Sequence, residues 1–211
     1  MTGSKSTKRG QGRPTDGGVG RAAIIESVRA ILRELPPSRI TISMVAREAG
    51  VDPALVRYYF KDRSNLLLEV VNDMLKGLPT APHAAADPSM AIQERIRESH
   101  RFSRSAKHMQ RLMIDELAEA KSEDIRLQHR EINLRAISFY RRMIEDDGGA
   151  KMREVEPMFL YLTIIGIFDF FVSAESLVRN IVEPGTDMNA LADDYTDFVA
   201  DLLLHGLLKK P

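Results

Sequence analysis

Apolar side chains recur at helical spacing along most of the chain, and short runs of proline and glycine interrupt them. The first helix is expected at about 21–35, where Ile24, Val28, Ile31 and Leu35 form one apolar stripe and two prolines follow. A longer helix is predicted to start at Ser64 as its N-cap and to end near residue 77. After a proline- and alanine-rich linker at 78–88, five more helices are expected, at 88–106, 109–121, 123–146, 154–182 and 187–208. The pattern predicts an all-α protein.

Residues 41–61 predict two short helices joined by a tight turn. Thr41 suits the N-cap of the first helix, because its hydroxyl can accept from a free backbone N–H of the first turn. Gly50 follows that helix, where a left-handed C-terminal cap costs glycine little. Asp52 can cap the second helix, and Pro53 fits its first position because the N–H there would be unpaired. Two short helices that cross steeply can place one helix in the major groove of DNA, so this pattern favours DNA binding.

The second short helix is expected to pack through Val56 and Phe60, which are four residues apart. Its outward residues are then Ala54, Leu55, Arg57 and Tyr58. An ordinary helical hairpin with a few polar residues is the alternative. The caps, the turn and the exposed arginine and tyrosine all agree with a DNA-reading pair of helices.

The string from Ala46 to Leu67, AREAGVDPALVRYYFKDRSNLL, resembles the N-terminal domain of TetR-type transcriptional regulators, and the resemblance extends over about 21–75. The family pattern ends its recognition helix with an aromatic pair, then phenylalanine, lysine, a short cap and a leucine-rich helix, all present here at the same spacing. Arg57 departs from it, because the family usually has tyrosine there, so base preference cannot be carried over. An arginine at this position can contact guanine or a phosphate.

The resemblance implies a homodimeric repressor that binds a palindromic operator in double-stranded DNA and is released by a small-molecule effector. It implies a three-helix helix-turn-helix domain at 21–77, an effector-binding and dimerisation domain at 78–211, and pairing through the last two long helices. Phosphate contacts are expected from Thr41, Ser43, Tyr58, Tyr59, Lys61 and Arg63, and base contacts from Pro53, Ala54, Leu55 and Arg57.

Residues 1–20 are rich in glycine, serine and basic residues, which predicts a disordered basic arm. Arg9 and Arg13 lie in a sequence close to the core of minor-groove AT-hooks. The arm can therefore contact DNA or remain a solvated tail, and the sequence leaves both open.

Charge divides the chain unevenly, although 30 Lys/Arg balance 30 Asp/Glu overall. Residues 1–63 contain 12 basic and 6 acidic residues, so the front has a surplus of +6 and the remainder −6. A basic front and an acidic back are expected if only the front meets phosphate. There is no cysteine and no apolar signal-like segment, and the apolar run at 157–168 is too short to span a bilayer. A cytoplasmic protein without membrane contact is expected.

No enzyme motif is found, and no catalytic residue, metal ligand or cofactor is predicted. The glycines at 17–20 are not preceded by a strand, as a phosphate-binding loop would require. His100, His108 and His129 lack zinc-protease spacing. A DNA-architectural protein without effector, and a helical ligand-binding protein that has lost DNA binding, remain as alternatives.

Three polar residues, Glu116, His129 and Asp169, lie among apolar neighbours and need partners, because burial of unpaired polar groups is costly. They can form structural hydrogen bonds or subunit contacts, or they can line an effector pocket. The other candidate pocket residues, which can equally be core, are Phe102, Met109, Met113, Phe139 and Tyr161. The helix expected at 154–182 is apolar nearly all round and must be buried on all sides. We therefore expect a second subunit to bury part of its surface.

Overall fold

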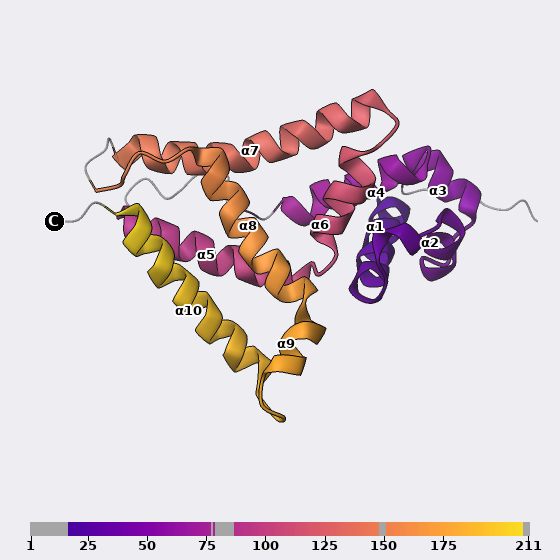
Figure 1. Ribbon diagram of the computed structural model, residues 1–211. Coiled ribbons are helices and arrows are strands. Elements are labelled where there is room, and N and C mark those ends of the chain that lie inside the picture. The colour runs from indigo at the N-terminus through magenta and orange to yellow at the C-terminus, as the bar shows by residue number, and fades with distance from the viewer. Residues whose placement is uncertain (1–16, 77, 79–86, 148–150, 209–211) are drawn as a thin grey trace, which may run out of the picture.

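The structure, a computed structural model, describes residues 17–76, 78, 87–147 and 151–208, and its elements in these ranges are helical (Figure 1). The predicted all-α class is confirmed. In chain order the elements are α1 (Gly17–Glu34), the 3₁₀ turn η1 (Pro37–Arg39), α2 (Ile42–Glu48), α3 (Pro53–Phe60), α4 (Arg63–Leu75), α5 (Pro88–Ser105), α6 (Met109–Arg111), the π-helical η2 (Leu112–Ala118), α7 (Glu123–Asp147), α8 (Pro157–Ser173), α9 (Glu175–Ile181) and α10 (Met188–Leu207). The arm residues Arg9 and Arg13 lie outside the described residues.

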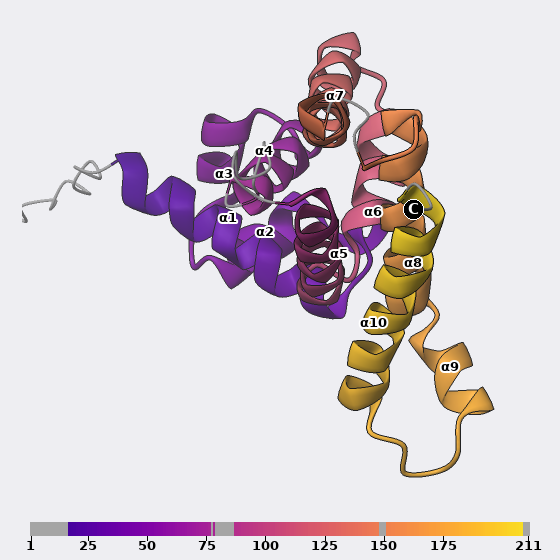
Figure 2. The same ribbon diagram turned by 90° about the vertical axis from the view of Figure 1, so that its left-hand side faces the viewer.

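Helices α1 to α4 form a head at one end of the molecule, and α5, α7, α8 and α10 form most of the body (Figures 1 and 2). The buried side chains fall into two groups. One fills the head and also includes Leu112 and Leu117 of η2 and Ile132 of α7. The other lies among α5, α7, α8 and α10, with Tyr140 and Phe168 fully buried in it. The head is therefore packed onto the body by apolar contact through η2, and the first core extends past the predicted domain boundary near residue 78.

Two helix starts differ from the prediction. Helix α1 begins at Gly17 instead of about 21, and Gly20 lies so close to α3 that an added Cβ would sit 3.5 Å from the ring of Tyr59. The first turn of α1 thus packs on the Tyr59 ring through Gly20. The apolar pattern of the sequence does not predict this tertiary contact. The N-cap of α4 is Asp62 and not Ser64, because Asp62 Oδ1 accepts from the backbone N–H of Asn65 at 2.9 Å.

Two body segments are less regular than expected. The helix predicted at 109–121 has only three α-helical residues before it widens into the π-helix η2, which ends at Ala118. The helix predicted at 154–182 begins at Pro157 and breaks at Ala174, so that α8 and α9 meet at an angle of 68°. No proline or glycine marks that break, which lies in a short polar stretch between Ser173 and Ser176. Within the described residues no single helix is long and apolar enough to cross a bilayer; only α8 and α9 together reach that length.

Candidate DNA-reading head and body pocket

The local geometry of α2 and α3 follows the predicted caps. Thr41 Oγ1 accepts from the backbone N–H of Met44 at 3.2 Å, and Asp52 Oδ1 accepts from that of Ala54 at 2.7 Å. Gly50 has a φ of 64°, the left-handed conformation that a side chain disfavours. The predictions for Thr41, Gly50 and Asp52 are confirmed, and together they fix where α2 ends and α3 begins.

Helix α3 is held on the head by one face only. Val56 and Phe60 are buried, and Ala46 of α2 is small and buried against the same core. The guanidinium of Arg21 lies 5.2 Å from the centre of the Phe60 ring and pairs with Glu69 of α4 at 2.7 Å. These contacts connect α1, α3 and α4, so α3 has a fixed orientation on the head.

The opposite face of α3 is open to solvent. Ala54, Arg57 and Tyr58 are exposed, with Tyr58 79% exposed, while Pro53 and Leu55 are half-buried. Among the described residues, the side chain of Arg57 has no hydrogen-bond or ion-pair partner. The exposed tyrosine and the unpaired arginine beside it are not needed for the packing of the head. Both side chains are therefore available to an external partner.

Residues at the two ends of this face are also accessible. Thr41 and Ser43 are exposed, and the Thr41 hydroxyl, which accepts within the cap, still has its own proton to donate. Lys61 is exposed and ends α3 with a φ of 65°, its backbone N–H donating to the Arg57 carbonyl at 2.8 Å. Tyr59 is only half-buried, and its ring contacts those of Tyr58 and Phe60 edge to face.

Arg63 differs from the other expected DNA contacts because its guanidinium points into the molecule. Nη1 and Nη2 donate to the two carboxylate oxygens of Glu116 on η2, at 2.5 and 2.8 Å. Nε donates to the carbonyl of Ile40 at 2.8 Å, and Nη2 also donates to that of Pro37 at 2.6 Å. The hydrogen bond from Arg63 holds the pKa of Glu116 below its ordinary value of 4.5, although burial opposes the shift. The first turn of α4 is thus tied to the body by a two-bond ion pair, and these donors are not free for phosphate.

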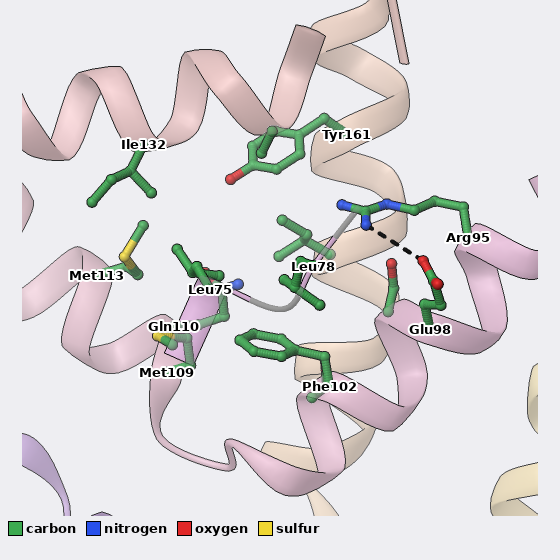
Figure 3. A pocket seen from close by; sticks show the side chains of 14 residues that line it. Leu75, Leu78, Arg95, Glu98, Phe102, Met109, Gln110, Met113, Ile132 and Tyr161 are labelled. Atoms are coloured by element: carbon green, nitrogen blue, oxygen red, sulfur yellow. Dashed lines mark ion pairs between the residues drawn. The ribbon is translucent and has the colours of Figure 1, made fainter. Parts of the chain in front are cut away.

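A cavity in the body lies among α4, α5, α6, η2, α7 and α8 (Figure 3). Four of the eight residues predicted to bind an effector line it, namely Phe102, Met109, Met113 and Tyr161. Figure 3 shows the ring of Tyr161 and the guanidinium of Arg95 pointing into the same space. Burial is the main cause that raises the pKa of Tyr161 to about 12, so this phenol stays protonated at neutral pH.

The other four predicted residues do not line this cavity. Glu116 is paired with Arg63. Phe139 lies outside the cavity lining, and its ring centre is 4.7 Å from the guanidinium of Arg95. His129 Nε2 lies 3.1 Å from Asn133 Nδ2, and Asn133 Oδ1 accepts from the Tyr161 hydroxyl at 2.6 Å.

The two titratable members of this group respond to burial. Burial lowers the pKa of His129, so the neutral ring can accept from Asn133. Asp169 on α8 is half-buried outside the cavity, and burial raises its pKa. His129 is therefore linked to the Tyr161 hydroxyl through Asn133, outside the cavity lining. Asp169 does not line the cavity.

Arg95 is a lining residue that was not among those predicted from the sequence. It is 8% exposed, although arginine on an amphipathic helix ordinarily faces water. A signal was present: Arg95, Ser99, Phe102 and Ser103 recur at spacings of four, three and one, so one face of α5 combines a cation with small and aromatic residues. The other lining residues not predicted for the site include Glu98, Gln110 and Ile165.

No protein-family model matches the chain. The helix-turn-helix transcriptional regulator BetI of Rhizobium meliloti (strain 1021) is 30% identical over 113 residues, which are 51% of this chain and 56% of that protein. The chain thus spans about half the length of this relative. The fold is similar to a TetR/AcrR-family regulator from Thermobifida fusca, with a TM-score of 0.60, 17% identity, and coverage of 88% of this chain and 97% of the other.

The fold is also similar to that of AibR, solved in complex with isovaleryl coenzyme A and operator DNA, with a TM-score of 0.59, 11% identity, and coverage of 85% and 97%. The chain therefore shares an all-helical fold with these solved structures. The sequence relative is named as a helix-turn-helix transcriptional regulator, and one of the solved structures as a TetR/AcrR-family regulator.

The part of the chain that the structure describes contains no group of three or more His, Cys, Asp or Glu arranged to hold a metal ion. The relative and the two solved structures described above are named as regulators or solved with operator DNA, and none of their names is that of an enzyme.

Proposed function

We propose that the protein is a sequence-specific DNA-binding transcriptional regulator that binds a palindromic operator as a homodimer. The main observation in its support is α3, whose buried face is fixed by Val56 and Phe60 and whose open face presents Arg57 and Tyr58. A helix of this size fits the major groove, and unpaired polar side chains on its outer face are free to meet base edges.

Within this proposal the exposed residues divide into two roles. Arg57 and Ala54, with the half-buried Pro53 and Leu55, face base edges, where Leu55 suits a thymine methyl group. The phosphate contacts are assigned to Thr41, Ser43, Tyr58, Tyr59 and Lys61. Arg63 is left out of this set because its donors are used inside the molecule. Arg9 and Arg13, which precede the described residues, are proposed to follow the minor groove.

The dimer is proposed to form through α8 and α10. On α8, Phe159, Leu162 and Phe170 are each more than half exposed and lie at helical spacing, with the exposed Gly166 between them. On α10, Phe198 and Leu202 are 61% and 55% exposed and four residues apart. Large apolar side chains exposed at helical spacing on two long helices are typical of an interaction surface. A two-fold dimer through this surface would present two α3 helices to successive major grooves.

The dimer has a direct test. Phe170→Asp places a charge in the proposed interface without removing a buried contact, because Phe170 is 64% exposed in the monomer. The expected result is a monomer by sedimentation at micromolar concentration, with an unchanged helical spectrum and weak operator binding. Leu127→Asp on α7, where the side chain is 50% exposed, is the matched control and should remain dimeric. A Phe170→Asp protein that sediments as a dimer contradicts this interface.

Effector release is proposed to act through the body cavity. Met109, Gln110 and Met113 of α6 and η2 line the cavity, and Glu116, one turn further along η2, holds Arg63 of the head. A ligand that favours one position of η2 would thereby favour one position of α4 and of the two α3 helices. Such a ligand lowers operator affinity only by the difference between its affinities for the two states. AibR, solved with an acyl-coenzyme A and operator DNA, supports the plausibility of two ligands on this fold.

The proposed function is tested by selecting bound sequences from a random pool of double-stranded DNA at near-physiological salt. Recovery of a short palindrome by the wild-type protein, and of single half-sites or nothing by Phe170→Asp, is the expected result. Recovery of DNA without a common sequence would instead indicate an architectural protein that binds broadly.

A further inference from the structure

Most side chains that line the cavity in the body are apolar, and a buried cation, Arg95, lies on one side of it. Arg95 is 8% exposed, and its guanidinium lies against the rings of Phe139 and Tyr140, at 4.7 and 5.5 Å. With the described residues it makes one hydrogen bond, from Nε to the Tyr140 hydroxyl at 3.2 Å, and one ion pair, from Nη1 to Glu98 at 3.7 Å. The ion-pair distance exceeds that of a hydrogen bond. The guanidinium, which has five N–H donors, thus has donor capacity directed at the cavity (Figure 3).

A second hollow continues from the first and shares Leu75, Leu78, Arg95, Ile132 and Ala136 with it. The inner hollow measures about 70 Å³ and the outer one about 280 Å³. Among the described residues, two further basic side chains and no acidic one line the outer hollow. Of these, Lys76 already pairs with Asp73, whereas Arg135 has no ion pair with a described residue. Arg95 therefore lies where the mainly apolar inner hollow meets the basic outer hollow.

We propose that this cleft binds an organic anion with an apolar body, of the class of medium-chain carboxylates. The carboxylate takes the free donors of Arg95, and the hydrocarbon lies against the apolar side chains of the inner hollow. Arginine is suited to this task because its planar fork donates two parallel hydrogen bonds to a carboxylate. Burial of the pair makes the match selective, because a neutral ligand would leave the buried cation with no anionic described residue nearer than Glu98, at 3.7 Å.

Glu98 gives the inference a specific consequence. Among the described residues that line the two hollows, Glu98 is the only acidic one, and its carboxylate is the ion-pair partner of Arg95. An incoming carboxylate must compete with it for the same cation. Removal of the Glu98 charge should therefore strengthen anion binding, whereas a purely structural Arg95–Glu98 pair predicts no such gain.

The test is calorimetric titration of the purified protein, without DNA, with hexanoate, octanoate and decanoate and with octanamide as the neutral analogue. At least one of the acids should bind, with octanamide at least tenfold weaker than octanoate. Glu98→Gln should tighten octanoate binding several-fold, and Arg95→Gln should weaken it at least tenfold. Arg97→Gln, which removes an exposed cation two residues away on the other side of α5, is the control and should change neither.

Equal binding of octanoate and octanamide, a Glu98→Gln protein that binds octanoate no better than wild type, or no binding of any acid in the series overturns the inference. The acid–amide comparison and Glu98→Gln keep the test decisive if Arg95→Gln does not fold. The inference rests on the cavity being the effector site, and the two can be separated. Octanoate that binds as expected but leaves operator affinity unchanged supports the anion site and contradicts effector release through it.

Discussion

The ion pair between Arg63 of α4 and Glu116 of η2 should contribute both to stability and to the connection between head and body. The side chains of Arg63 and Glu116 are 29% and 14% exposed, and two charge-assisted hydrogen bonds join them. A hydrogen bond to a charged group contributes about 1.5–3 kcal/mol, and residual solvent access reduces that value. Glu116→Gln keeps one acceptor but turns an amide N–H toward a cation, so we expect a loss of about 2 kcal/mol in the free energy of unfolding.

The assay is urea unfolding followed by circular dichroism at one fixed protein concentration, because a dimer's apparent stability depends on concentration. Glu119→Gln, an exposed neighbour on the same segment without an ion pair to a described residue, should change the free energy of unfolding by less than about 0.5 kcal/mol. A double-mutant cycle of Glu116→Gln with Arg63→Met should give a coupling of about 2 kcal/mol.

The pH dependence has a definite sign. The pKa of Glu116 is lowered in the folded state, so the folded state holds fewer protons than the unfolded state near pH 4.5. The advantage of wild type over Glu116→Gln should therefore be complete above about pH 5 and should decline as pH falls below 4.5 toward the lowered folded pKa. A Glu116→Gln loss no larger than that of Glu119→Gln, or a coupling near zero, would refute the reasoning. A flatter salt dependence of DNA binding after Arg63 substitution would show that Arg63 faces phosphate instead.

Three further predictions concern the head. Arg57→Ala should cost about 1–3 kcal/mol per half-site on the best operator and relax one base position, measured by fluorescence anisotropy on operator variants; an equal loss on every sequence would exclude base reading. Lys61→Asn, which removes the charge but tolerates the φ of 65°, should weaken binding to all sequences and flatten the salt slope by about one unit per half-site; an unchanged slope would exclude a phosphate contact. Gly50→Ala should cost about 1–2 kcal/mol in urea unfolding, and Gly50→Asn less, because an added Cβ there meets no atom within 4 Å and only the positive φ resists it; equal losses would point to a different cause.

The head was predictable from sequence because its determinants are local. Thr41, Gly50 and Asp52 each act within three or four residues of themselves, so composition at the right spacing was sufficient. Ser64 was a wrong prediction for the same kind of reason, since Asp62 competes for the same helix start and its carboxylate reaches the N–H of Asn65.

The body was less predictable because its determinants are tertiary. The break at Ala174 has no proline or glycine beside it, and the polar residues around it are compatible with a continuous helix. Arg63 and Glu116 are 53 residues apart, and only the packing of η2 on the head brings them together. Arg95 appears in the sequence as one more surface arginine, and the aromatic rings beneath it come from α7. Of the eight residues predicted for an effector pocket, Phe102, Met109, Met113 and Tyr161 line the cavity, whereas Glu116, His129, Phe139 and Asp169 do not.

Sequence-specific DNA binding by α3 is the central claim, and one affinity ratio tests it most directly. The dissociation constant of the wild-type dimer would be measured on the selected palindrome and on a duplex of the same length and composition with its sequence scrambled, at the same near-physiological salt. The palindrome should bind at least about a thousandfold more tightly, as specific recognition by base contacts requires. Affinities within about tenfold of each other would contradict sequence reading by α3, because phosphate contacts alone would then account for the binding.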